Sequence, residues 1–267
     1  MGDWRSYDQI AERYDRVWSA RFEVVARRIW ALMPPRAGDK VLDIGTGTGI
    51  VPRTLSEVAP APGLRVGCDR SAGMLLRARA QVVGLRVLVG DATALPFQGE
   101  SFDLATASFV LSHVRDYRSA LAETLRVLKP LGILGVTNWA PSSDSYSAAW
   151  SDCLAEAISK PEAERALAEV APWEDHFSRQ GALEAALSRA GFSPLRSDAV
   201  AVESNLTVDQ FLDDRELSSG GRLGFHLLGA DGWELFRAAA REMFRARFGS
   251  SFRYRRDALV VIARKQA

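Results

Sequence analysis

The sequence predicts an α/β protein in which helices cover both faces of a doubly wound, mostly parallel sheet of seven strands. Two observations support this fold class. Short runs rich in β-branched residues alternate along the chain with amphipathic helical segments, and such alternation is typical of parallel sheets. The chain has 267 residues, of which 47% are apolar, and no internal repeat, so we expect a single domain over residues 1–267.

An N-terminal helical arm is expected over residues 1–35. Apolar side chains recur there at spacings of three and four residues, which is the period of one face of a helix. The pattern ends before Pro34 and Pro35, because proline interrupts a helix interior. The apolar face of this arm consists of Ile10, Tyr14, Val17, Trp18, Phe22, Val25, Ile29 and Leu32.

The next hundred residues, 39–138, should form five strands with helices between them. Ser71 is a suitable N-cap for the second of these helices, and Pro130 stops the third. Right-handed crossovers would place the strands in parallel. The expected strands cover 40–44, 64–68, 85–89, 102–107 and 133–137, and the helices cover 50–58, 72–82 and 117–128.

Two later segments, 140–175 and 205–250, are expected to cover a substrate pocket. In the first, the regular alternation of strands and helices gives way to helical sequence rich in serine and alanine. The second separates the last two strands and should itself be helical. The remaining expected elements are a helix at 180–190 ended by Gly191, closing strands at 192–203 and 258–263, and helices at 209–216 and 233–248.

The amino-acid composition limits which classes of binding partner are expected. The 34 basic and 33 acidic side chains nearly balance, so a nucleic acid partner is not expected. The longest clean apolar run, 258–263, is far too short to span a membrane, and the first residues do not follow a signal-peptide pattern. With only Cys68 and Cys153, no cysteine metal site is expected. We therefore expect a cytoplasmic monomer or homodimer that acts on a small molecule.

A glycine-rich turn follows the first expected strand. It contains Asp43, Gly45, Thr46, Gly47 and Gly49, and its glycines allow the backbone to turn tightly and approach a ligand. The spacing is GxGxG, whereas dinucleotide-binding turns usually have GxGxxG. An acid just before the glycines would repel a pyrophosphate but suit a cationic amino-acid group. The turn therefore predicts a nucleotide-like ligand with a positive charge.

Two more acids follow the next two strands. Asp69 ends the second strand, 20 residues after Gly49, where a carboxylate can accept both hydroxyl groups of a ribose. Asp91, followed by Ala92, comes after the third strand, where it can accept a hydrogen bond from an exocyclic amine such as that of adenine. Three acids after three successive strands indicate a nucleoside site at the carboxyl edge of the sheet.

Together these residues resemble the class I S-adenosylmethionine-dependent methyltransferases. Arg126-Val127-Leu128-Lys129-Pro130 resembles the family's segment before the fifth strand. Within the family, the chain is most similar to the small-molecule branch that contains the ubiquinone and menaquinone biosynthesis methyltransferases, with a methyltransferase type 11 domain. This similarity rests on Ala94-Leu95-Pro96-Phe97, Ser101-Phe102-Asp103 and His113-Val114-Arg115-Asp116, and the whole resemblance covers 39–137.

The resemblance implies a Rossmann-like methyltransferase fold in which core 39–138 binds S-adenosylmethionine, with S-adenosylhomocysteine as product. The loop 45–49 would lie against the methionine moiety, Asp69 on the ribose, and Asp91 with Ala92 at the adenine. Phe109 would flank the cofactor near its sulfonium. The complete implied cofactor-binding set is Tyr14, Asp43, Gly45, Thr46, Gly47, Gly49, Asp69, Arg70, Met74, Asp91, Ala92 and Phe109.

The N-terminal arm also resembles the family. Tyr7-Asp8-x-x-Ala11-x-x-Tyr14-Asp15 is similar to the arm that closes over the cofactor in small-molecule relatives. The other interpretation is a helix that uses Tyr14 only as core.

Leu131 departs from the family pattern, since relatives carry glycine there. If the turn keeps a positive φ at Leu131, the cost is about 1 kcal/mol.

Methyl transfer from a sulfonium is an in-line displacement, so alignment in a dry pocket supplies most of the catalysis. A base is needed only if the acceptor loses a proton. His113, just after the fourth strand, is the candidate base; the other interpretation is a histidine that holds a neighbouring loop.

Aromatic and basic side chains outside the core are candidates for acceptor recognition. Four tryptophans are suited to line a pocket for a flat or apolar acceptor, or to pack in the protein interior in the ordinary way. They are Trp139, Trp150, Trp173 and Trp233. In Phe252-Arg253-Tyr254-Arg255-Arg256, the three arginines would bind an anionic group of the acceptor or form a solvated charged rim.

The function predicted from the sequence is methyl transfer to O, N or C of a small organic acceptor, in secondary-metabolite or quinone-like biosynthesis. One alternative is an NAD(P)-dependent oxidoreductase, which the missing GxGxxG and the unexplained Asp91 disfavour. A second alternative is a non-catalytic cofactor-binding protein that keeps the same fold.

Overall fold

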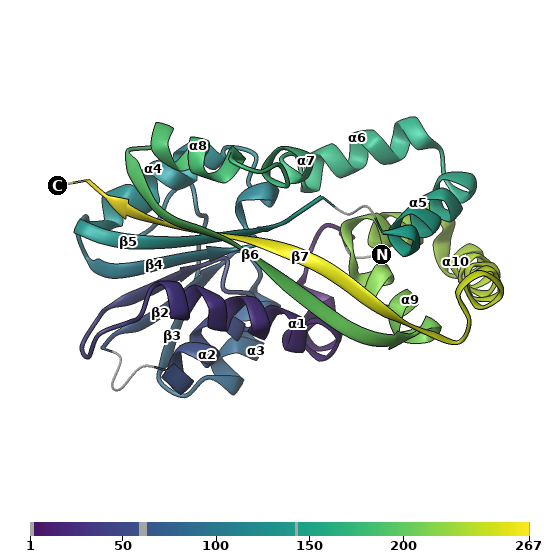
Figure 1. Cartoon of the computed structure of the whole chain (residues 1–267), viewed down its shortest axis with the longest axis horizontal. Helices are drawn as coiled ribbons and strands as arrows, with labels where there is room; N and C mark the ends of the chain where they lie inside the picture. Colours follow the sequence, from purple (N-terminus) through teal and green to yellow (C-terminus); the bar gives the residue numbers. More distant parts are fainter. Residues whose placement is uncertain (1–2, 59–62, 142–143, 267) are drawn as a thin grey trace.

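A computed structural model of the chain describes residues 3–58, 63–141 and 144–266. Its centre is a seven-stranded sheet in the order β3-β2-β1-β4-β5-β7-β6 (Figure 1). The strands from β3 through β5 are parallel, and β7 is antiparallel to both of its neighbours. The strands are β1 (Val41–Ile44), β2 (Arg65–Asp69), β3 (Leu85–Val89), β4 (Phe102–Ser108), β5 (Leu128–Trp139), β6 (Phe192–Thr207) and β7 (Ser251–Lys265).

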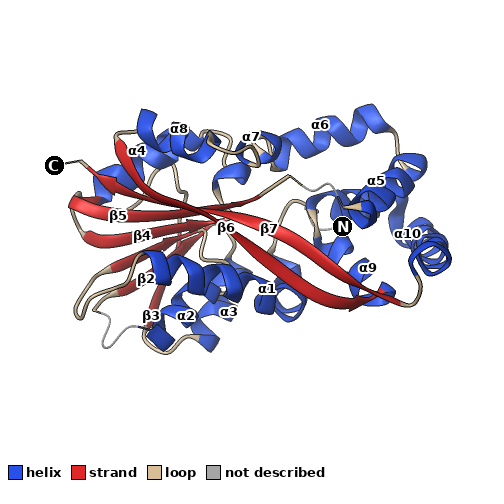
Figure 2. Cartoon of the chain, in the orientation of Figure 1, coloured by secondary structure: helices blue, strands red, loops and turns tan. Residues whose placement is uncertain are grey.

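Helices cover both faces of this sheet, as the sequence predicts (Figure 2). The core on one face contains side chains from α4, α7 and α8, and the core on the other face contains side chains from α1 and α2. The helices are η1 (Asp8–Ile10), α1 (Ala11–Leu32), α2 (Ile50–Val58), α3 (Ala72–Gln81), η2 (Leu111–His113), α4 (Tyr117–Val127), α5 (Ser145–Ala157), α6 (Lys160–Val170), α7 (Glu174–Phe177), α8 (Ala182–Arg189), α9 (Val208–Leu217) and α10 (Ser219–Phe248).

Local signals set several of the helix ends. Ser71 caps α3 as expected, because its Oγ accepts a hydrogen bond from the Met74 N–H at 3.2 Å. After α8, Gly191 has a φ of 95°, a left-handed conformation that glycine adopts without strain. At the start of α9, Thr207 and Gln210 form a reciprocal capping box.

The last two strands are longer than the sequence indicates. They pair along their whole length, from Phe192 opposite Lys265 to Thr207 opposite Ser251, whereas the expected strands are 192–203 and 258–263. The difference arises because β5 pairs only with residues 258–264 of β7. The rest of β7 pairs with β6 alone and carries exposed polar side chains in alternation, so an apolar run marks only the part inside the sheet.

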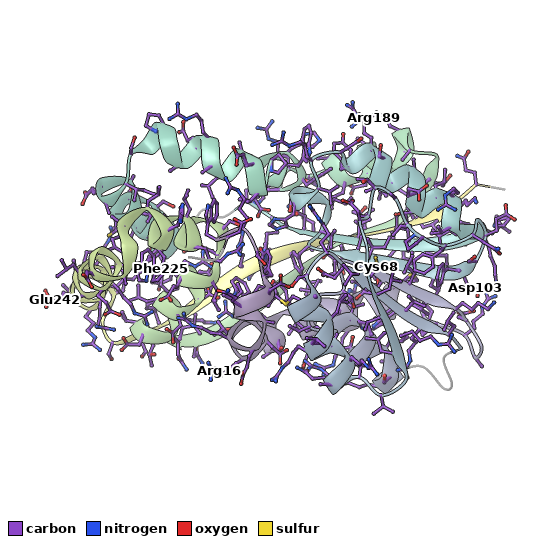
Figure 3. All side chains as sticks on the ribbon, turned by 180° about the vertical axis from the view of Figure 1, so that it is seen from behind. Arg16, Cys68, Asp103, Arg189, Phe225 and Glu242 are labelled. Carbon is purple, nitrogen blue, oxygen red and sulfur yellow. The ribbon has the colours of Figure 1, made fainter. Side chains whose placement is uncertain are left out.

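Both expected cover segments are helical. The first contains α5, α6 and α7, and the second contains α9 and α10, which begin at Val208 because β6 occupies 205–207. A separate apolar cluster joins the covers to the outer part of the β6–β7 ribbon. Within α10 the helix breaks at Gly229, with a φ of 68°. Figure 3 shows Phe225 and Glu242 in this cover, far from Cys68 in the sheet.

The described part of the chain contains no helix that is long and apolar enough to cross a membrane.

Candidate active site

The glycine-rich loop between β1 and α2 forms the centre of the candidate site. Gly45 and Gly47 have φ values of 64° and 53°, which favour glycine. A Cβ on Gly45 would lie 2.3 Å from a methyl carbon of Val110, so the loop packs directly on the segment after β4. A Cβ on Gly47 would meet no atom within 4 Å among the described residues. The loop is therefore packed at Gly45 and open at Gly47.

Asp69 at the end of β2 is bonded to this loop. Its Oδ2 accepts a hydrogen bond from the Gly47 N–H at 2.8 Å, and its Oδ1 accepts one from the Ser71 N–H at 2.9 Å. Burial raises the pKa of Asp69, while these backbone hydrogen bonds oppose the rise. The carboxylate that the sequence predicts to bind the ribose thus joins the loop to the start of α3.

Asp43 lies below the loop and is only 2% exposed. The Thr106 hydroxyl donates a hydrogen bond to its Oδ1 at 2.6 Å. Its Oδ2 has no hydrogen-bond partner within the described residues. Burial raises the pKa of Asp43 to about 7. An unpartnered buried carboxylate oxygen beside the loop is an acceptor that a cationic amino-acid group would suit.

Thr46 does not turn its side chain outward from the loop. It packs over Gly67 in β2, where an added Cβ would lie 2.8 Å from the Thr46 Cγ2. Its backbone N–H donates to the Cys68 carbonyl at 3.0 Å. Thr46 therefore helps to fix the conformation of the glycine loop against β2.

Four further candidates in the core divide into an exposed pair and a buried pair. Asp91 and Arg70 are exposed at the carboxyl ends of β3 and β2, with 3.9 Å between Arg70 Nε and Asp91 Oδ2. Thr93 donates to Asp91 through its backbone N–H at 2.9 Å and its hydroxyl at 2.8 Å, which lowers the pKa of Asp91. Ala92 and Met74 are buried. Asp91 is thus charged and accessible where the adenine would lie.

Two acids of the arm that were not among the predicted site residues attach it to the core. Asp8 Oδ1 accepts hydrogen bonds from the Ser71 hydroxyl at 2.7 Å and the Gly73 N–H at 2.8 Å. Asp15 Oδ1 accepts a hydrogen bond from the Thr48 hydroxyl at 3.0 Å. The available signal was the paired Tyr-Asp pattern in which both acids occur. The arm is thereby fixed to the glycine loop and to the start of α3.

Tyr14 lies in this arm among other aromatic rings. Its ring centroid is 5.7 Å from that of Tyr7, in an edge-on arrangement, and 6.2 Å from that of Trp18. Burial raises the pKa of Tyr14 well above its ordinary value, so its hydroxyl stays protonated.

Phe109 connects the arm to the end of β5. Its ring centroid lies 4.9 Å from that of Phe22 in α1 and 4.5 Å from that of Trp139 in β5. Its φ of 58° is a left-handed conformation that costs a non-glycine residue about 1–2 kcal/mol. Such strain often occurs at functional sites. We call these three rings the aromatic wall, and its residue Phe109 directly precedes Val110, the residue that packs on Gly45.

Of the four tryptophans considered as pocket walls, only Trp139 belongs to this group of rings. Trp150 and Trp233 pack in the apolar cluster of the covers. Trp173 Nε1 donates to the Arg115 carbonyl at 3.0 Å. Ordinary packing therefore accounts for the last three.

His113 is exposed at the end of η2 and contacts the first cover. Its Nδ1 lies 2.9 Å from the carbonyl oxygen of Val170, the last residue of α6. This geometry holds a neighbouring segment. With Nδ1 engaged, any proton-accepting role would fall to Nε2.

A buried ion cluster joins the arm to the second cover. Asp214 in α9 is fully buried, and its two oxygens lie 2.6 Å from nitrogens of Arg21 and Arg215. No pattern along the chain indicates this cluster, because Arg21 and Asp214 are 193 residues apart.

A hollow of about 660 Å³ is present at the opposite edge of the sheet. It is lined by residues at the amino ends of the strands, including Lys40 and Phe102. Because the glycine loop and the acids lie at the carboxyl ends, this hollow is not part of the candidate site.

The described residues contain no group of three or more histidine, cysteine, aspartate or glutamate side chains suited to hold a metal ion. The site at the carboxyl edge combines an open glycine turn, an orphaned buried carboxylate oxygen and an accessible acid. This set fits S-adenosylmethionine, which brings a cationic amino-acid group, two ribose hydroxyls and an exocyclic amine.

Comparison with known proteins agrees with this geometry. Residues 42–136 match the family model described as "Methyltransferase domain". A demethylmenaquinone methyltransferase of Mycobacterium marinum is 35% identical over 71% of this chain and 84% of that protein. One from Corynebacterium kroppenstedtii is 31% identical over 75% and 92%. A solved SAM-dependent methyltransferase of Thermotoga maritima has the same fold, with a TM-score of 0.55 and 21% identity over 99% of both chains.

Proposed function

We propose, since this chain belongs to the S-adenosylmethionine-dependent methyltransferase family that includes the demethylmenaquinone methyltransferases, that its acceptor is a planar, quinone-like aromatic molecule. The chain is an enzyme, its cofactor is S-adenosylmethionine, and its acceptor is a small molecule. The acceptor's chemical type and the role of each residue are the proposal. We further propose that it acts in the cytoplasm as a monomer or homodimer.

One observation supports the acceptor type above all. The aromatic wall consists of Phe22, Phe109 and Trp139. Phe109 directly precedes Val110 in the chain, and Val110 packs on Gly45 of the cofactor loop. A flat ring placed against this wall would lie beside the cofactor. Aromatic walls suit flat, apolar ligands, since they supply large contact areas with fixed geometry.

The proposed cofactor contacts follow the geometry of the loop. The open backbone at Gly47 and the carboxylates of Asp43 and Asp69 would hold the amino-acid and ribose parts, and Asp91 would accept from the adenine amine. When bound, the cofactor supplies a methyl group on a sulfonium, whose transfer releases a neutral thioether. The arm, anchored through Asp8 and Asp15, would exclude water from the bound cofactor.

We assign His113 a positioning role rather than that of a base. Its Nδ1 contact with Val170 holds the end of α6 near the carboxyl edge of β4. The cover would then keep the acceptor aligned, which is the main catalytic requirement for this displacement.

Titration calorimetry with S-adenosylhomocysteine, and separately with NADH, tests the cofactor assignment. We expect micromolar binding of S-adenosylhomocysteine and none of NADH. Binding of NADH alone would support an oxidoreductase instead.

Methyl transfer is then measured with labelled S-adenosylmethionine and a menaquinone-type naphthoquinol. Labelled product would support the quinone-like acceptor. Cofactor binding without transfer to any aromatic acceptor in a panel of phenols, naphthols and quinols would favour a non-catalytic binding protein with the same fold.

A further inference from the structure

The three arginines near the start of β7 do not share one environment. Arg253 and Arg255 are exposed on the same face of the strand, where Arg253 pairs with Glu203 and Arg255 pairs with Asp257 at 2.9 Å. Arg256 is on the other face, because side chains alternate along a strand. Its side chain is only 20% exposed. Two of the three therefore form a solvated rim, and the third points inward.

Arg256 lies on the aromatic wall. Its guanidinium carbon is 4.6 Å from the centre of the Trp139 ring, in a cation–π contact. The Trp139 ring in turn lies 4.5 Å from that of Phe109, measured between centroids. The positive charge is thus directly beside the place proposed for a flat acceptor.

The surroundings of Arg256 supply little negative charge. Its ion-pair partner is Glu174 of α7, whose Oε1 is 3.5 Å from Nη2. Its Nε is buried and has no hydrogen-bond partner in the part of the chain that the structure describes. Burial and the nearby charge of Arg215 lower the pKa of Arg256. The negative charges of Glu174 and Asp214 oppose this decrease in pKa, but Asp214 is already paired with Arg215 and Arg21.

A largely buried guanidinium with incomplete pairing is well suited to bind an anionic ligand. Its planar donor edges match a carboxylate, and charge-assisted hydrogen bonds of this kind are about twice as strong as neutral ones. A carboxylate on an acceptor ring held at the aromatic wall would supply the missing negative charge.

We propose that Arg256 recognises a carboxylate on the acceptor, so that the substrate is a planar aromatic acid rather than a neutral ring. This inference rests on the proposed function and narrows its acceptor class. Glu174 then competes with the ligand for the same guanidinium, as a carboxylate already near Nη2.

The test uses two probes that differ only in the carboxylate, 1-hydroxy-2-naphthoate and 1-naphthol. Each is titrated into the protein saturated with S-adenosylhomocysteine, and its dissociation constant is measured by calorimetry. We expect the acid to bind about tenfold more tightly or better, the ratio typical of one charge-assisted interaction. Arg256→Met should abolish this preference, and Arg256→Lys should keep part of it.

Matched variants separate recognition from general charge effects. Arg253→Met and Arg255→Met remove the same charge from the same strand and should leave the preference unchanged. Glu174→Gln should tighten binding of the acid and leave that of 1-naphthol unaltered. Thermal unfolding of each variant identifies those that lose their fold, and in that event the result is taken from Arg256→Lys and Glu174→Gln.

The outcomes distinguish this inference from the proposed function. If wild-type protein binds S-adenosylhomocysteine but binds both probes equally, or does not bind the acid, the carboxylate assignment is wrong and the cofactor assignment stands. The same holds if Arg256→Met retains the preference. If S-adenosylhomocysteine itself does not bind, the proposed function is the part that fails.

Discussion

The carboxylate of Asp69 accepts a hydrogen bond from the backbone N–H of Gly47 at 2.8 Å. The end of the second strand thereby fixes the loop that follows the first. Asp69, which is proposed to bind the ribose, therefore also shapes the glycine turn that is proposed to hold the amino-acid part of the cofactor.

Substitution of Asp69 by asparagine tests this double role. The amide side chain of Asp69→Asn would keep an oxygen acceptor but lose the charge, so S-adenosylhomocysteine affinity should fall by roughly 1–3 kcal/mol. Asp69→Ala would also leave the Gly47 and Ser71 N–H groups unpaired, and should therefore lower the free energy of unfolding as well. Calorimetric titration and urea unfolding measure the two effects. Asp103→Asn, at the opposite edge of the sheet, is the control, and equal affinity in Asp69→Asn and wild type would exclude the ribose role.

Asp43 should make the stability of the free protein depend on pH. Its pKa is about 7 in the folded state and about 3.9 in an unfolded chain. Between these values the folded protein keeps a proton that the unfolded chain has released, so the free energy of unfolding decreases as pH rises from about 4 to about 7. Asp43→Asn, which can still accept from Thr106, should flatten this dependence. Urea unfolding across the window compares the two proteins, and parallel curves would contradict the assigned pKa.

His113→Ala distinguishes a positioning role from a base. Loss of a general base usually costs about 10²–10⁴ in rate, whereas loss of the Val170 contact should raise KM and lower the melting temperature with less than about a tenfold change in kcat. His113→Asn offers a donor near the position of Nδ1 and should restore both. A fall in kcat of a hundredfold or more in both variants would identify His113 as the base.

Leu131 should be a site where glycine stabilises the protein. The structure gives it a φ of 64° and 57% exposure, so the side chain gains little from burial while the backbone is strained. Leu131→Gly should raise the free energy of unfolding by up to about 1 kcal/mol. Leu131→Ala keeps the Cβ and should give no such gain. Denaturant unfolding of the wild type and the two variants measures these free energies. An equal gain in stability in Leu131→Ala would attribute the effect to removal of the exposed apolar side chain and not to relief of backbone strain.

The order and type of most core elements follow from the sequence. The strands around the glycine turn and the cap at Ser71 depend on residues close together in the chain. The strand order of the sheet was not predicted. The fold class was, because alternating strands and helices have few arrangements that bury both faces of a sheet.

The limits of the last two strands were harder to predict. Residues 251–257 pair only with β6 and alternate between exposed and buried positions. Without a neighbouring strand on the other side, this segment has no continuous apolar run, which is the signal that identified 258–263.

The sequence by itself determined the fold class, the glycine turn and the three acids at or near the carboxyl ends of successive strands, because these depend on local spacing and on the rule that parallel strands end at a common edge. Only the tertiary structure decided which distant side chains meet. It placed Asp15 against Thr48, Asp214 between Arg21 and Arg215, and Arg256 on Trp139 apart from its exposed neighbours. Such contacts join segments far apart in the chain, and their partners are set by packing geometry rather than by any pattern along the sequence.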